Sequence, residues 1–248
     1  MNKVNILDWK EFQISRLFKI SSPASRSIKT YNEGDVPYVS SGSINNGIIS
    51  YLEPNKDEDL EKGNCITVSP LDGSSFYQED DFLGRGGAGS AISLLYNENL
   101  TRYNALFICT VIKIMAQKFD YSDALTSNNL KTLRVSLPAQ KDKNGEFIID
   151  TNKKYTDEGF VPDWDYMGAY MEVIEEKAQN RIDILNKTSM YKGYKQDKIE
   201  MRGDRAEMSD FPLYLNTVAG GLDRRDQTIG GFSFVVKIYA VPVVEIIG

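Results

Sequence analysis

The chain has 248 residues, of which 41% are hydrophobic and 11% aromatic, enough for one large domain or for a domain with an appendage. Its net charge of −6 and isoelectric point near 4.9 argue against a nonspecific nucleic-acid binder, but allow a specific one with a local basic patch. There is no histidine, which excludes Ser-His and Cys-His nucleophile pairs and histidine-ligated zinc. An enzyme would have to rely on carboxylates, lysine, tyrosine or a cofactor.

The sequence carries no targeting or membrane signal that we recognise. MNKVNILDWK at the start lacks the apolar run of a signal peptide, and no window of about 18 apolar residues predicts a membrane span. The two cysteines, Cys65 and Cys109, lie in apolar, strand-like runs and are expected to be reduced core residues. We therefore expect a cytoplasmic protein.

The first predicted elements surround a β-hairpin. A strand near residues 11–14 comes first, then a turn of helix or a strand ending at Phe18, followed by a polar loop at 21–35. Residues 36–54, VPYVSSGSINNGIISYLEP, are typical of a hairpin, because Asn and Gly in the central Asn-Asn-Gly tolerate the positive φ of tight turns. Short polar side chains before the turn favour recognition over catalysis, and a surface hairpin without a partner is the alternative.

Mixed strand and helix signals follow the hairpin. Apolar residues at spacings of three and four predict a buried helix at 100–119, and β-branched runs predict strands. In chain order, we expect a solvated acidic loop at 53–62, a strand at 64–70, an edge-like strand at 76–82, a glycine-rich loop at 84–90, a buried strand at 91–96, the helix, a turn and a strand at 126–137, and a loop or hairpin at 139–162.

A long amphipathic helix is predicted after Pro162, with Asp163 as its N-cap. Its apolar residues form a seam of coiled-coil type at Trp164, Met167, Met171, Ile174, Ala178 and Leu185. Such a seam packs either on its own domain or on a partner, and its position after a domain-like boundary favours a partner helix. We divide the chain into a domain at 1–162, a helix at 163–193 and a tail of unassigned role at 194–248.

Three motif-like patterns fail the context that their chemistry needs. The GxGxxG within residues 84–90 lacks the preceding hydrophobic strand and the following helix of a dinucleotide site. The FxGxG of residues 82–86 is a methyl-donor pattern, but no Pro-Pro pair accompanies it, as a DNA methyltransferase would require. The carboxylates and lysine of 175–177 share one helix, whereas a metal nuclease places carboxylates on adjacent strands. We therefore expect neither a cofactor nor a metal.

Taken in order, five blocks resemble the target recognition domain of specificity subunits from type I restriction–modification systems, to which some type II specificity chains are similar. The blocks are WKEFQISRLFKI, GDVPYVSSGSINNGIISYLEP, GNCITVSPLDGSSFYQEDDF, ALFICTVIKIMAQKFDYSDALTSNNLKTLRVSLP and VPDWDYMGAYMEVI. The resemblance covers roughly residues 8–187, and residues 195–248 depart from it.

The resemblance implies a mixed, β-rich α/β domain that reads half of a bipartite DNA site, followed by a spacer helix of coiled-coil type. It implies a non-catalytic subunit whose partners are double-stranded DNA, methyltransferase subunits and a restriction subunit. With one domain and one helix, we expect either a half-subunit that self-associates through the helix or a chain whose second half is lost or fused elsewhere. The alternative is an interaction module that binds a methyltransferase through residues 163–187 without reading DNA.

The candidates for DNA contact are polar and basic residues in predicted loops. Residues 1–162 carry 18 Lys and Arg against 21 Asp and Glu, so we expect a local patch, with partners supplying phosphate affinity. Asn can pair with adenine and Arg with guanine, although Arg85 could equally be structural. The candidates are Arg26, Lys29, Ser43, Asn45, Asn46, Arg85, Ser127, Asn128 and Lys131. The resemblance transfers no contact residue by residue.

Overall fold

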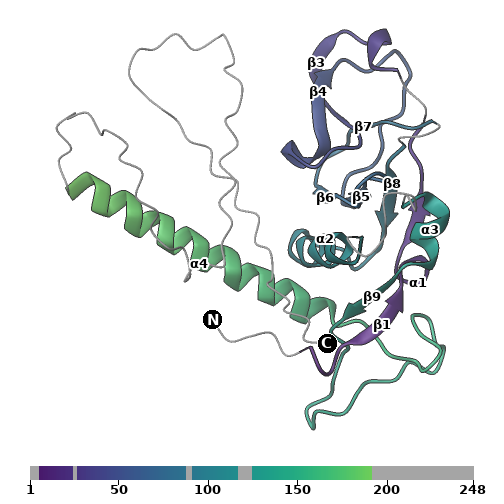
Figure 1. Cartoon of the computed structure of the whole chain (residues 1–248), viewed down its shortest axis with the longest axis vertical. Helices are drawn as coiled ribbons and strands as arrows, with labels where there is room; N and C mark the ends of the chain where they lie inside the picture. Colours follow the sequence, from purple (N-terminus) through teal and green to yellow (C-terminus); the bar gives the residue numbers. More distant parts are fainter. Residues whose placement is uncertain (1–5, 25–26, 88–90, 117–124, 192–248) are drawn as a thin grey trace. The chain divides into compact units, whose positions relative to one another are not determined.

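The computed structural model describes residues 6–24, 27–87, 91–116 and 125–191, the last seven by their backbone alone (Figure 1). The chain divides into two compact units, Met1–Glu172 and Val173–Gly248. This division falls inside the long helix that follows Pro162, so the first turns of that helix belong to the first unit. Of the predicted segments, Arg26 and the tail at 194–248 lie outside the described residues.

Among the described residues of the first unit, short strands form three sheets. A two-stranded antiparallel sheet joins β1 (Lys10–Gln13) to β9 (Arg134–Leu137). A four-stranded antiparallel sheet has the order β2 (Lys19–Ser21), β8 (Ser93–Tyr96), β5 (Cys65–Val68) and β6 (Ser75–Gln78). The third sheet has the order β4 (Ile48–Leu52), β3 (Glu33–Val39) and β7 (Leu83–Gly84), with β3 antiparallel to β4 and parallel to β7.

Helices complete a mixed α/β fold (Figure 1). They are α1 (Ile14–Leu17), the 3-10 turns η1 (Ile28–Thr30) and η2 (Asn45–Gly47), α2 (Arg102–Ala116), α3 (Ser127–Thr132) and α4 (Trp164–Tyr191). The predicted buried helix is confirmed as α2, which lies against β5, β6 and β9. Its buried residues Phe107, Ile108, Val111 and Ile112 recur one and four positions apart, as a helix covered along one side requires.

The buried residues include both cysteines. Cys65 joins Val39, Phe82, Ile92 and Leu94 in one core cluster, and Cys109 is buried in α2. Neither cysteine forms a disulfide, which confirms the prediction of reduced core residues. Burial raises the pKa of the Cys65 thiol to about 12, and burial also raises the pKa of the Cys109 thiol. Both thiols are therefore protonated at neutral pH and are poor nucleophiles.

The hairpin and the strands at 64–70, 76–82 and 91–96 are confirmed as β3–β4, β5, β6 and β8, with β6 at an edge of its sheet. One local prediction is wrong, because residues 127–129 begin the short helix α3 and not a turn. The Thr126 hydroxyl accepts a hydrogen bond from the Asn129 amide at 3.3 Å, and Leu130 is fully buried. An N-cap followed by one buried anchor is enough to fix a single helical turn in this context.

The start of α4 packs on its own domain. Asp163 caps it as predicted, since its carboxylate accepts a hydrogen bond from the Tyr166 amide at 2.9 Å. Met167 and Met171 are 0% and 3% exposed, and Trp164 meets Phe18 edge-to-face with ring centroids 6.1 Å apart. The first half of the seam is thus covered by the chain itself, which corrects the prediction that these residues face a partner. None of the described helices is both long and apolar enough to cross a membrane.

Candidate nucleic-acid interface

The turn of the β3–β4 hairpin is held by its own side chains. Asn45, Asn46 and Gly47 have φ values of 50°, 57° and 74°, so three successive residues occupy the left-handed region. The Asn45 side-chain amide donates to the Ile48 carbonyl at 3.0 Å, which closes the turn locally. The Asn-Asn-Gly signal is therefore explained by backbone geometry, because these residue types tolerate positive φ best.

Asn46 connects this turn to strand β6. Its amide donates to the Tyr77 carbonyl at 3.1 Å and to Gln78 Oε1 at 3.0 Å. Gln78 is 4% exposed, and its Nε2 donates to the Asn46 carbonyl at 3.0 Å and to Thr67 Oγ1 at 3.1 Å. Reading adenine would need the same Asn46 amide. These bonds give Asn46 a structural role and weaken the prediction that it contacts a base.

Replacing Asn46 with Asp should destabilise the domain while Asn45→Asp should not. Asn46→Asp removes a donor and faces a carboxylate toward two acceptor oxygens on β6, at a cost of about 1–3 kcal/mol. Asn45 is exposed and loses only its bond to Ile48, so it is the matched control. Urea unfolding followed by circular dichroism measures both variants. Equal midpoints for the two variants would contradict the structural role of Asn46.

The remaining candidates near the hairpin are dispersed. Lys29 is exposed on η1, whose Ile28 packs against the core cluster under β3 and β4. Ser43 is exposed before the turn. Arg85 is half-buried after β7, and its backbone amide donates to the Val39 carbonyl at 2.9 Å. The structure thus places these three with the three-stranded sheet, apart from the candidates on α3.

A second polar surface forms where α1, α3, β1 and β9 meet. Gln13 is its centre: its amide donates to Ser15 Oγ and to the Lys131 carbonyl, both at 2.9 Å. Gln13 is also the cross-strand partner of Arg134, so the two share one side of the β1–β9 pair. We call Gln13, Ser15, Asn128, Lys131 and Arg134 the α1–α3 face. All but the half-buried Gln13 are exposed.

Of the predicted residues, Asn128 and Lys131 lie on this face, while Ser127 points inward, with its Oγ 3.1 Å from Ser93 Oγ. Sequence reasoning missed Gln13, Ser15 and Arg134. Their signal is not local, because it depends on the pairing of strands more than a hundred residues apart. Arg134 also forms a loose ion pair with Glu11 at 3.8 Å.

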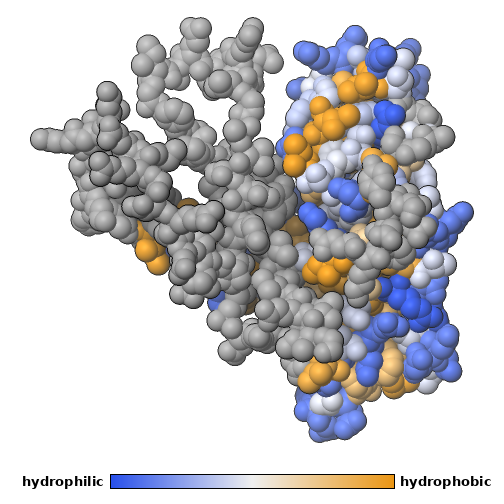
Figure 2. All heavy atoms as spheres, viewed as in Figure 1, coloured by the Kyte–Doolittle hydropathy of each residue, from blue (hydrophilic) through white to orange (hydrophobic). Residues whose placement is uncertain are grey.

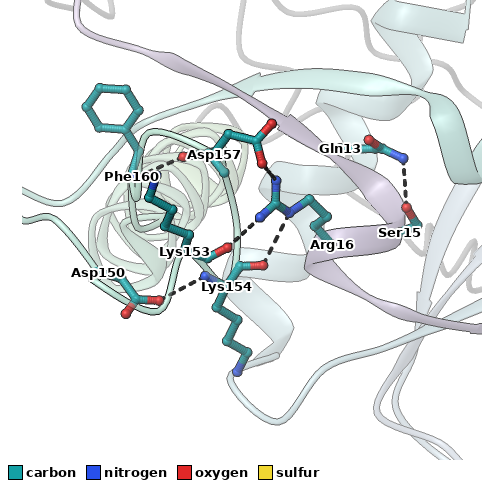
Figure 3. A network of polar contacts seen from close by, with 9 residues as sticks. Gln13, Ser15, Arg16, Asp150, Lys153, Lys154, Asp157 and Phe160 are labelled. Atoms are coloured by element: carbon teal, nitrogen blue, oxygen red, sulfur yellow. Dashed lines mark hydrogen bonds and ion pairs between the residues drawn. The ribbon is translucent and has the colours of Figure 1, made fainter.

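Arg16, the residue after Ser15, forms its bonds within the protein (Figure 3). Its guanidinium reaches Asp157 Oδ1 at 2.7 Å and the Lys154 carbonyl at 3.4 Å, and it also donates to the Lys153 carbonyl. The hydrogen bond from Arg16 lowers the pKa of the Asp157 carboxyl. Arg16 therefore fastens the segment at 139–162 to α1, and its donors are directed at the protein and not at a ligand.

Charge is unevenly divided along residues 1–162. Residues 33–81, which contain the hairpin, β5 and β6, carry eleven acidic and two basic side chains, a net charge of −9. The other residues of 1–162 carry sixteen basic and ten acidic side chains, a net charge of +6. A count over all 162 residues hides this difference. Phosphate groups are therefore repelled by the segment 33–81, and the basic excess lies in the remaining residues, which include the α1–α3 face and also Lys29 and Arg85.

Among the described residues, no group of three or more His, Cys, Asp or Glu side chains is placed to hold a metal ion. The donors of the α1–α3 face are amide, hydroxyl, ammonium and guanidinium groups. Such groups can bind phosphates and the edges of bases, with Asn or Gln suited to adenine and Arg or Lys to guanine. The geometry therefore fits recognition of a nucleic acid.

Comparison with known proteins gives a consistent result. Residues 6–158 match the family described as "Type I restriction modification DNA specificity domain". A curated relative, the type II restriction enzyme specificity subunit S.BcgI of Heyndrickxia coagulans, is 26% identical over 185 residues, which are 73% of this chain and 48% of the relative. The chain thus spans about half the length of that relative.

Solved structures of low sequence identity also align. The type I S subunit from M. genitalium is 16% identical, with a TM-score of 0.43 over 75% of this chain and 44% of that one. The HsdS subunit from Thermoanaerobacter tengcongensis is 15% identical, with a TM-score of 0.43 over 72% of this chain and 40% of that one.

Proposed function

The chain belongs to the family of type I restriction modification DNA specificity domains, and from this premise we propose that it is the DNA-recognition chain of a restriction–modification complex. In this proposal it reads one half of a bipartite site in duplex DNA and docks methyltransferase subunits. It performs no catalysis itself and works in the cytoplasm. A restriction subunit is a further partner of the assembled complex.

The observation that supports DNA recognition most strongly is the division of charge within residues 1–162. A net charge of +6 over the residues outside 33–81 favours contact with DNA phosphates there, although the whole chain is acidic. Among these residues, Lys131 and Arg134 supply cations and Asn128 supplies an amide, while the Gln13 amide holds Ser15 and the Lys131 carbonyl in place. We therefore propose the α1–α3 face as the surface that contacts DNA, with Lys29 and Arg85 as outlying contacts.

For partner docking we propose the later part of α4. Because Met167 and Met171 are covered by the first unit, the exposed seam is shorter than the sequence pattern indicates. Ile174 and Ala178 are half-buried and remain accessible to a partner, whereas the side chain of Leu185 lies outside the described residues. We propose that this part of the helix, within residues 163–193, binds the methyltransferase or a second copy of the chain as a half-subunit.

A second function deserves a test because the whole chain carries a net charge of −6. It is an interaction module that binds a methyltransferase through α4 and reads no DNA. The two functions differ in one observable, the protection of a defined DNA sequence.

The deciding experiment is a footprint of the purified chain with the methyltransferase from the same restriction–modification locus. We expect a defined protected sequence and an affinity for it about a thousandfold above that for unrelated DNA. The chain without its partner should protect DNA weakly. A stable complex that protects no defined sequence would reject DNA recognition and support the interaction module.

A further inference from the structure

The outer side of the β3–β4 hairpin exposes large apolar side chains. Ile44, Ile49 and Tyr51 are 63%, 54% and 51% exposed. Ile49 and Tyr51 are two residues apart on β4 and so point to the same side of the strand, and Ile44 precedes the turn. A band of hydrophobic residues is visible over the β3–β4 part of the molecule in Figure 2. Exposed apolar groups that gather on one element commonly mark a contact surface.

The strand that carries these residues is also at an edge. Within the part of the chain that the structure describes, β4 pairs with β3 on one side only in the order β4–β3–β7, which makes it an edge strand. Charged residues and prolines commonly protect such edges, yet the segment Ile48–Leu52 contains neither. Either apolar contacts or strand addition could therefore cover β4.

The hairpin is held in one shape before any partner arrives. The Asn46–Gln78 bonds attach its turn to β6, and the Ser40 amide donates to the Gly47 carbonyl at 2.9 Å. At the other end, the Glu53 amide donates to the Asn32 carbonyl at 3.0 Å. A surface fixed in this way loses little conformational entropy on binding, which favours its use as a docking site.

Charge identifies the kind of partner. Exposed Glu33 and Asp35 on β3 and Glu53 after β4 lie at the end of the hairpin away from the turn, near Tyr51, within the segment of net charge −9. DNA phosphates would be repelled, whereas lysine and arginine side chains would be attracted. We propose that the hairpin face, formed by Ile44, Ile49 and Tyr51 with Glu33, Asp35 and Glu53 at the end away from the turn, docks a protein surface that combines an apolar patch with positive charge at one end. The inference rests on the proposed function in taking the methyltransferase as the protein that carries this surface.

Two hairpin variants test the proposal, one apolar and one charged. The first combines Ile49→Ser with Tyr51→Ser, and the second combines Asp35→Lys with Glu53→Lys. Each should weaken binding of the purified methyltransferase by about tenfold or more, as isothermal titration calorimetry would measure. The loss in the charge variant should shrink as salt is raised, because salt screens exposed charges. A control, Ile148→Ser with Ile149→Ser, removes side chains that are 40% and 50% exposed elsewhere and should bind normally.

DNA affinity of the complex, measured at saturating methyltransferase, separates the alternatives. We expect both hairpin variants to retain it. If both variants bind the methyltransferase as tightly as the unaltered chain, the proposal is wrong. It is also wrong if the variants bind the methyltransferase normally but lose DNA affinity, because that result would assign the hairpin to DNA. If the footprint of the unaltered complex shows no defined site while the variants still lose the methyltransferase, the proposed DNA function fails and the docking surface stands.

Discussion

Reversing the charge of Lys131 and Arg134 together should reduce specific DNA affinity about a hundredfold or more at roughly 0.1 M salt, through lost phosphate contacts and added repulsion. Both residues are exposed beside Gln13 on the α1–α3 face, in the part of the domain with excess positive charge. The double variant Lys131→Glu, Arg134→Glu should also lower the salt dependence of binding, because each lost phosphate contact removes about 0.9 from the slope of log affinity against log salt.

The matched control is Lys56→Glu with Lys62→Glu, which changes the net charge by the same amount on the acidic segment. Lys62 pairs with Asp81 at 2.8 Å, and both control residues are exposed. Electrophoretic mobility shifts of the complex on cognate DNA, at several salt concentrations, compare the two variants. An equal loss in the control would indicate a general effect of net charge and would remove the α1–α3 face from the proposal.

The uneven distribution of charge can be counted from the sequence, but only when residues 1–162 are divided into segments. The balance of 18 basic and 21 acidic residues over 1–162 hides the net charge of −9 at 33–81. Gln13 and Arg134 could not be placed together from local pattern, because their proximity depends on the antiparallel pairing of β1 with β9. Position in a predicted loop selects Asn45 and Asn46 as contacts, but Asn46 bonds to β6.

Prediction from the sequence was also incomplete for helix α4. Spacings of three and four in the sequence identified the buried Met167 and Met171 in the first turns of α4, and Asp163 identified its start. The spacing of apolar residues predicts that one side of a helix is buried, but it does not say whether the protein's own core or a partner helix buries it. Both bury the same side chains. Met167 and Met171 are covered by the first unit, which only the packing around Trp164 and Phe18 made visible.

Met171→Asp is therefore expected to unfold the domain and not merely to release a partner. Met171 is 3% exposed, and placing a carboxylate there should cost about 3–5 kcal/mol, a large fraction of a typical domain stability of about 5–15 kcal/mol. Met171→Leu conserves volume and should cost less than about 1.5 kcal/mol. Urea unfolding of the chain alone gives both values.

Ile174→Asp, one turn further along α4, separates the two roles of the helix. Ile174 is half-buried, so the carboxylate can reach water and the domain should unfold near its normal midpoint. If the later helix docks a partner, the same variant should lose self-association or methyltransferase binding in sedimentation velocity. A Met171→Asp chain that folds normally but loses its partner would instead place Met171 in the interface, because a residue buried in the core cannot be changed in this way without loss of stability.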